Sequence, residues 1–202
     1  MAEQWTRLGL MNTALVNRGW DEIVSEEDGT PEYRNMARNW PLIVEAELEE
    51  GAYDVTRVEA SPAALTSDSF GFEHKFAIPG DALHIRKVWL ISGGQRYHCD
   101  NWLQNSTHVF LTLPSDSYTC TIEYIVSADP SVWGANFATG VQLMLEAGLA
   151  RGLEKDPVAS RELMAQAAEY FQRARTKSSK SRSAGPAVRQ GGLANARFGR
   201  GA

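Results

Sequence analysis

The chain has 202 residues, of which 43% are hydrophobic and 22% charged, a composition typical of a globular protein with one compact core or two small ones. No apolar run approaches the roughly 18 residues of a membrane-spanning helix, and the N-terminus lacks the basic-then-apolar order of a secretory signal. We therefore expect a protein that folds in a cytoplasm.

Charge is distributed unevenly along the chain. No acid follows Glu169, whereas eight lysines and arginines do; residues 1–169 hold the remaining 12 bases and all 25 acids, a net charge of −13. An acidic body followed by a basic tail indicates that the tail contacts a different kind of surface from the one that the body presents.

Two amphipathic helices are predicted at the start of the chain. Apolar residues recur at helical spacing over residues 5–20 and again from Pro31, where Thr30 is a candidate cap, until Gly51. Pro41 lies inside the second pattern and lacks a backbone donor, so we expect a kink there or a break into two pieces.

Residues 53–68 are ambiguous between strand and loop, and the pattern then changes to alternation. Four to six short strands between Phe70 and Val126, separated by tight turns, predict an antiparallel meander. Cys99 and Cys120 fall in this region. In a reducing compartment they are expected to be free, half-buried thiols rather than a disulfide, and the absence of a CxxC motif argues against a thiol-redox or zinc site.

Helical spacing returns in residues 129–152 and from Pro157 to about Arg175, each start marked by aspartate and then proline. After that helix, Ser, Gly, Ala and Arg dominate the sequence. Because this segment has few large apolar side chains to bury, we expect it to be disordered. The predicted fold class is α+β. The helical core comprises residues 1–52 and 127–176, the β insertion residues 53–126, and a flexible basic C-terminal arm residues 177–202.

The helix over residues 129–152 carries a row of small residues beside its large ones. Glycine inside a helix costs up to about 1 kcal/mol relative to alanine, so several of them indicate close approach by a neighbouring backbone. That neighbour is either the last helix of the same chain or another subunit. The candidates for a subunit interface are Gly134, Ala138, Gly140, Ala147 and Gly148.

No set of residues in the sequence points to catalysis. The four histidines fall in or near predicted strands and lack the spacing of a metal site: His74, His84, His98 and His108. The sequence also has no glycine-rich phosphate loop before a helix and no GxSxG motif. We expect neither an enzyme nor a bound metal or cofactor.

The basic tail suggests nucleic-acid binding, docking on a protein partner, or a tail that only adds solubility. Phosphate contacts need only charge and reach, but the acidic body would repel a duplex and aromatic interleaving is sparse. A docking arm that orders on its partner is the favoured interpretation. Its candidate residues are Arg175, Lys177, Lys180, Arg182, Arg189, Arg197 and Arg200. Trp89 and Trp102, near predicted strands, leave a sugar-binding module as a further alternative.

The order of these motifs resembles the head-to-tail adaptor proteins of tailed phages, especially the tail tubular protein A family of short-tailed phages. Three stretches carry the resemblance, over roughly residues 8–175. The first helix and the step after it match at Asn12, Ala14, Leu15, Gly19, Ile23 and Ser25. A strand pair matches at Phe76, Pro79, Asp81, Leu83, Ile85 and Val88, and a helix entry matches at Tyr124, Asp129, Trp133 and Phe137.

This resemblance implies a structural connector with no turnover. Such adaptors form a ring, usually of twelve subunits, that docks under the portal protein in the virion and receives the tail nozzle protein. DNA passes through the channel without specific binding, and acidic walls suit that role. The resemblance places the protein at the head–tail junction, and in the host cytoplasm during assembly.

Overall fold

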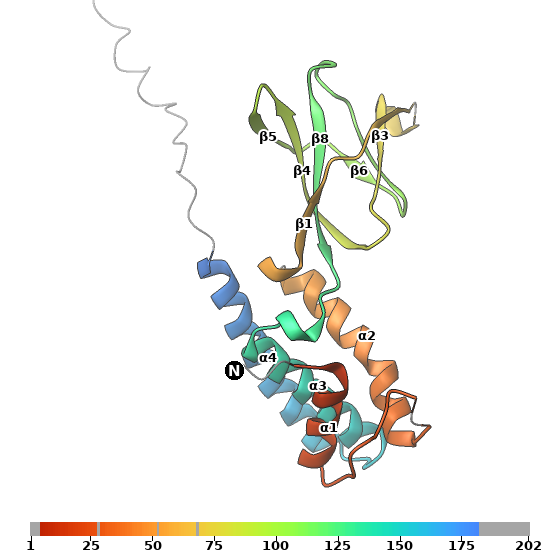
Figure 1. Cartoon of the computed structure of the whole chain (residues 1–202), viewed down its shortest axis with the longest axis vertical. Coiled ribbons are helices and arrows are strands. Elements are labelled where there is room, and N and C mark those ends of the chain that lie inside the picture. Colours follow the sequence, from red (N-terminus) through yellow and green to blue (C-terminus); the bar gives the residue numbers. More distant parts are fainter. Residues whose placement is uncertain (1–4, 28, 52, 68, 182–202) are drawn as a thin grey trace, which may run out of the picture.

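The computed structural model describes residues 5–27, 29–51, 53–67 and 69–181. Within these ranges, four α-helices form one end of the molecule, here called the helical body, and eight strands form the other, the β part (Figure 1). The fold is α+β, as the sequence predicts. Within the described ranges, no helix combines the length and the apolar character needed to cross a membrane.

Both of the first two helices begin at a threonine cap, and the cap predicted at Thr30 is confirmed. Helix α1 (Arg7–Asn17) has Thr6 as its cap and is followed by Gly19 at φ 75°, while Thr30 Oγ1 accepts from Tyr33 N at the start of α2 (Pro31–Gly51). The expected break at Pro41 is absent, and α2 runs as one helix. Buried side chains on both sides of Pro41 hold it together, because they pack into one core: Met36, Val44 and Leu48.

The second pair of helices differs from the sequence prediction at both ends. Asp129 caps a short 3₁₀ helix, η3 (Pro130–Val132), rather than the long helix; Trp133 and Gly134 are extended, and α3 (Ala135–Gly152) begins after them. Asp156 caps α4 (Pro157–Ser181) as predicted. Because α4 continues to Ser181, residues 177–181 of the predicted arm are helical. Residues 182–202 lie outside the described part.

Helix α3 lies at the centre of the helical body, where α1, α2 and α4 pack against it. Its large residues Phe137, Val141, Leu145 and Leu149 are buried in the shared core. The apolar residues of α3 are buried against the three other helices, which explains why helices from the two ends of the chain form one body.

The β part consists of two four-stranded antiparallel sheets rather than the predicted meander. One sheet has the order β1 (Arg57–Ala60), β8 (Thr119–Val126), β4 (Ala82–Ser92), β5 (Gln95–Cys99), and the other β2 (Ala64–Thr66), β3 (His74–Ala77), β7 (His108–Leu111), β6 (Leu103–Gln104). The chain passes repeatedly from one sheet to the other, and alternating apolar residues of both form a second core.

The β part is entered and left through adjacent strands, because β1 pairs with β8 from Arg57↔Ile125 to Ala60↔Ile122. Two short 3₁₀ helices complete the described elements: η1 (Asp54–Thr56), before β1, and η2 (Ser69–Gly71). Cys99 and Cys120 are free, as expected, but fully rather than half buried. Burial raises the pKa of the Cys120 thiol to about 12.

Candidate partner-binding site

The small-residue row of α3 faces neighbours in the same chain. A Cβ at Gly140 would lie 2.6 Å from the Phe171 ring of α4, and Ala138 and Ala147 are buried. The interpretation of Ala138, Gly140 and Ala147 as a subunit interface is therefore wrong. Gly140 is required because α4 brings an aromatic ring against the α3 backbone at that point.

Of the remaining two interface candidates, Gly148 has an explanation within the subunit and Gly134 does not. A Cβ at Gly148 would lie 3.0 Å from Asn39 of α2, so this residue, too, marks close approach by a helix of the same chain. Gly134 differs from the others. It is the exposed N-cap of α3, and a Cβ there would meet nothing within 4 Å.

Arg175 joins α4 to the end of α2. Its Nη2 lies 2.7 Å from Glu47 Oε2 and its Nε 2.9 Å from Glu47 Oε1, while Nη1 lies 2.8 Å from Glu50. Tyr53 completes this cluster by donating its hydroxyl to Glu47 at 2.6 Å. Burial, and then the Glu47 carboxylate, raise the pKa of Tyr53 well above its usual range. Arg175 is thus engaged within the chain, which corrects its assignment to the docking arm.

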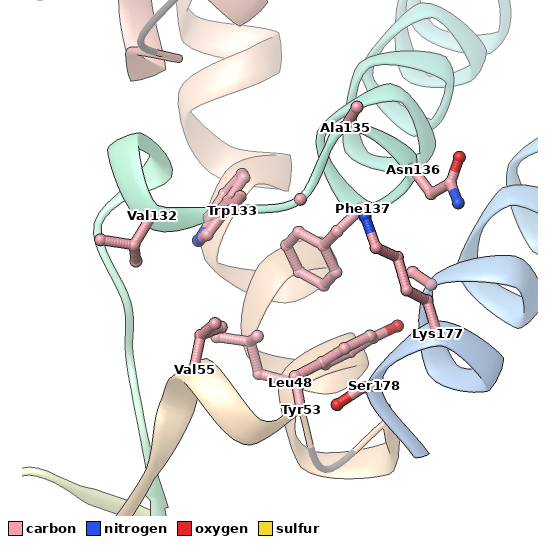
Figure 2. Close-up of a pocket in the computed structure, with 12 residues that line it drawn as sticks. Leu48, Tyr53, Val55, Val132, Trp133, Ala135, Asn136, Phe137, Lys177 and Ser178 are labelled. Carbon is pink, nitrogen blue, oxygen red and sulfur yellow. The ribbon is translucent and has the colours of Figure 1, made fainter. Parts of the chain in front are cut away.

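Beside this cluster lies a pocket of about 370 Å³, at the joint between the helical body and the β part (Figure 2). Its apolar wall comes from both linkers that connect the two parts as well as from the helices. The side chains of this wall are those of Leu48, Tyr53, Val55, Val132, Trp133, Phe137 and Ala174. Val55 and Val132 are more than half exposed, so apolar surface continues out to the rim.

The aromatic side of the pocket is fixed by ring contacts and one hydrogen bond. Trp133 stacks on Trp40 at 5.7 Å and meets Phe137 edge-on at 4.7 Å, and Phe137 in turn meets Tyr53 at 4.9 Å. The Trp133 indole donates to the Ala128 carbonyl at 3.0 Å. Because these rings hold one another in place, the pocket exists before any partner binds.

The polar rim of the pocket favours negative charge. Lys177 stands at the opening, exposed, and forms no ion pair with any residue in the described ranges. The N-terminus of α3, at Gly134–Phe137, forms part of the lining, and no side chain caps it. Uncapped N–H groups and the helix dipole add a partial positive charge on that side.

The described residues also bear on a metal site and on a sugar platform. Among them, no three His, Cys, Asp or Glu side chains lie together as a metal site would require. Trp89, a candidate sugar platform, is half-buried; Arg96 and Lys87 lie over its ring, and its indole donates to the buried Glu123. Its ring is thus already occupied by neighbouring cations.

The structure brings together only part of the predicted site. Lys177 and Gly134 line the pocket; Lys180 lies on α4, and Arg182, Arg189, Arg197 and Arg200 fall outside the described residues. Sequence patterns missed Val55 and Val132, because exposed valines in linkers carry no periodic signal. The capping pattern at Asp129 correctly predicted a helical turn there, but it did not predict that Trp133 and Gly134 after that turn are extended.

A scan against protein-family models finds no match to this chain, and a search of curated proteins finds no relative.

Proposed function

We propose that the protein is a structural head-to-tail connector of a tailed bacteriophage, forming a ring between portal and tail nozzle through which DNA passes. The observation that carries the proposal is the way the chain is divided. Helices from both ends build one body, and the β part is inserted through the paired strands β1 and β8. This is the element order for which the sequence resembles the adaptor family.

The charge distribution agrees with a channel role. Residues 1–169 carry a net charge of −13, and acidic walls would let DNA pass without holding its phosphates. Since the small-residue row of α3 is closed within the subunit, contacts between neighbouring subunits need other surfaces. Exposed apolar side chains on α2 and α4 are available for them: Leu42, Val158 and Met164.

The test is the mass of the purified chain by light scattering, alone and with the portal protein encoded in the same genome. We expect a monomer or weak associate alone, and a ring on the portal, because only a partner surface can offset the cost of ordering the basic arm. A stable free dodecamer would contradict the portal dependence. Failure to bind the portal at all would contradict the adaptor assignment.

The arm is tested separately by ending the chain after Ser181. This variant keeps α4 complete and should retain the fold while binding the portal more weakly, with a smaller dependence on salt. Nucleic-acid binding through the arm is the alternative. It predicts that the full chain, but not the shortened one, retards a labelled duplex at moderate salt.

A further inference from the structure

The pocket at the joint carries an inference that does not depend on the adaptor proposal. We propose that it is a docking site for an acidic, apolar segment of a partner protein. Such a segment would place one large apolar side chain among Tyr53, Trp133 and Phe137, with an adjacent carboxylate facing Lys177.

The apolar half of this assignment follows from the lining. A volume of about 370 Å³ walled by three aromatic rings lies in the range of pockets that hold specific ligands. Val55 and Val132 at the rim are already exposed, so a partner gains by covering them as well. The view into the pocket shows side chains from α2, η1, η3, α3 and α4 around one opening (Figure 2).

The charge of the occupant follows from the rim. The Lys177 ammonium has no carboxylate partner within the described ranges, and the uncapped start of α3 borders the same space. Both favour an anion, and both disfavour the protein's own residues 182–202, which contain four arginines and no acid. The occupant is therefore assigned to another protein.

Binding at this place would also affect the joint between the two parts. Tyr53 and Val55 belong to the chain entering the β part, and Val132 and Trp133 to the chain returning from it. A side chain seated between them touches both linkers and the helical body at once. Partner binding should therefore restrict the β part relative to the helices.

The proposal is tested with a ¹⁵N-labelled full chain and two blocked peptides, Gly-Glu-Leu-Phe-Glu-Gly and its glutamine counterpart Gly-Gln-Leu-Phe-Gln-Gly. We expect the acidic peptide to shift the Trp133 indole N–H and the amides of Gly134–Phe137. The glutamine peptide should bind the same residues about fivefold more weakly, from the loss of an exposed ion pair and the helix-end contribution.

Two variants separate charge from shape. Lys177→Gln should weaken the acidic peptide about threefold and leave the glutamine peptide unchanged, whereas Val55→Gln should weaken both. Lys155→Gln, an exposed lysine beyond the other end of α3, is the control and should change neither. Because Val55 and Lys177 are both exposed, these changes leave the core intact.

Three results would overturn the assignment. They are shifts confined to residues outside the pocket, equal affinity for the two peptides, and tighter binding of a peptide of residues 182–202 or of dodecanoate than of the acidic peptide. Portal binding by the Val55→Gln chain is a separate readout. Its loss would link the pocket to the connector role, and its retention would leave the pocket for another partner.

Discussion

The two ends of α3 are built differently. Beyond its C-terminal end, Glu154 accepts hydrogen bonds from Arg18 and from the Trp20 indole. Nearly two turns inside the helix, Asn17 donates to Glu146 at 2.7 Å. At its N-terminal end, Gly134 supplies no side-chain cap, and an apolar pocket opens beside it. The C-terminal end is thus covered by α1 and the residues after it, whereas the N-terminal end borders the proposed docking pocket.

This difference shows that small residues and open surface need not coincide. The glycines and alanines of α3 suggest a surface for a neighbour, yet the neighbour is α4 or α2 of the same chain. The open surface lies instead among large residues, where Tyr53, Trp133 and Phe137 line the pocket. Changes at these places should therefore differ in size, and the following variants test that order.

The largest effect is expected for Gly140→Leu, in the closed middle of α3. Its Cβ alone would come within 2.6 Å of Phe171, which is itself buried. We expect a loss of about 3 kcal/mol in the free energy of unfolding, the upper part of the range for overpacking. Urea denaturation followed by circular dichroism measures it.

Gly134→Leu is the matched control for this substitution. Its Cβ meets nothing within 4 Å, so it should cost less than about 1 kcal/mol, mostly from a poorer N-cap. Equal stability of the Gly140→Leu chain and the wild type, with a change only in self-association, would restore the subunit-interface interpretation of the row.

A smaller loss is expected for Arg175→Ala. The change leaves the Glu47 carboxylate, whose side chain is 9% exposed, without its cation. Breaking a buried pair costs about 3–5 kcal/mol, but Arg175 is about one-third exposed, so we expect about 2 kcal/mol. Arg173→Ala, two residues earlier in an exposed pair with Glu169, should cost less than about 0.5 kcal/mol. Similar losses for both would show that the Glu47 cluster does not hold α4.

The closed end of α3 is tested by pH. The Arg18 guanidinium lowers the pKa of Glu154, so the folded state favours the ionised carboxylate. Its contribution is complete above the ordinary value of 4.5 and is lost as pH falls through the lowered pKa. Glu154→Gln should therefore cost about 1 kcal/mol at pH 7 and much less at pH 3. A loss of stability that is the same at both pH values would exclude the ion pair as its cause.

The sequence predicted the fold class and the caps at Thr30 and Asp156 from local patterns. These features depend on residues within one or two turns of each other. The order of strands in two sheets, the ion pair from Arg175 to Glu47 and the pocket depend on residues far apart in the chain. Local spacing cannot predict them, because each follows from how α2, α4 and the two linkers meet.

The smallest effect on stability is expected for Gly134→Ser. This substitution is also the most direct test of the N-terminal end of α3. Gly134 has φ −73° and ψ 149°, the extended geometry of an N-cap, so a serine hydroxyl there can accept from the free N–H groups of the first turn. We expect a gain of a few tenths of a kcal/mol in unfolding free energy, measured by thermal denaturation. The same hydroxyl would compete with an anion at that helix end, so the acidic peptide should bind more weakly although the protein is more stable. Stability and binding changing in the same direction would show that the start of α3 takes no part in recognising the carboxylate.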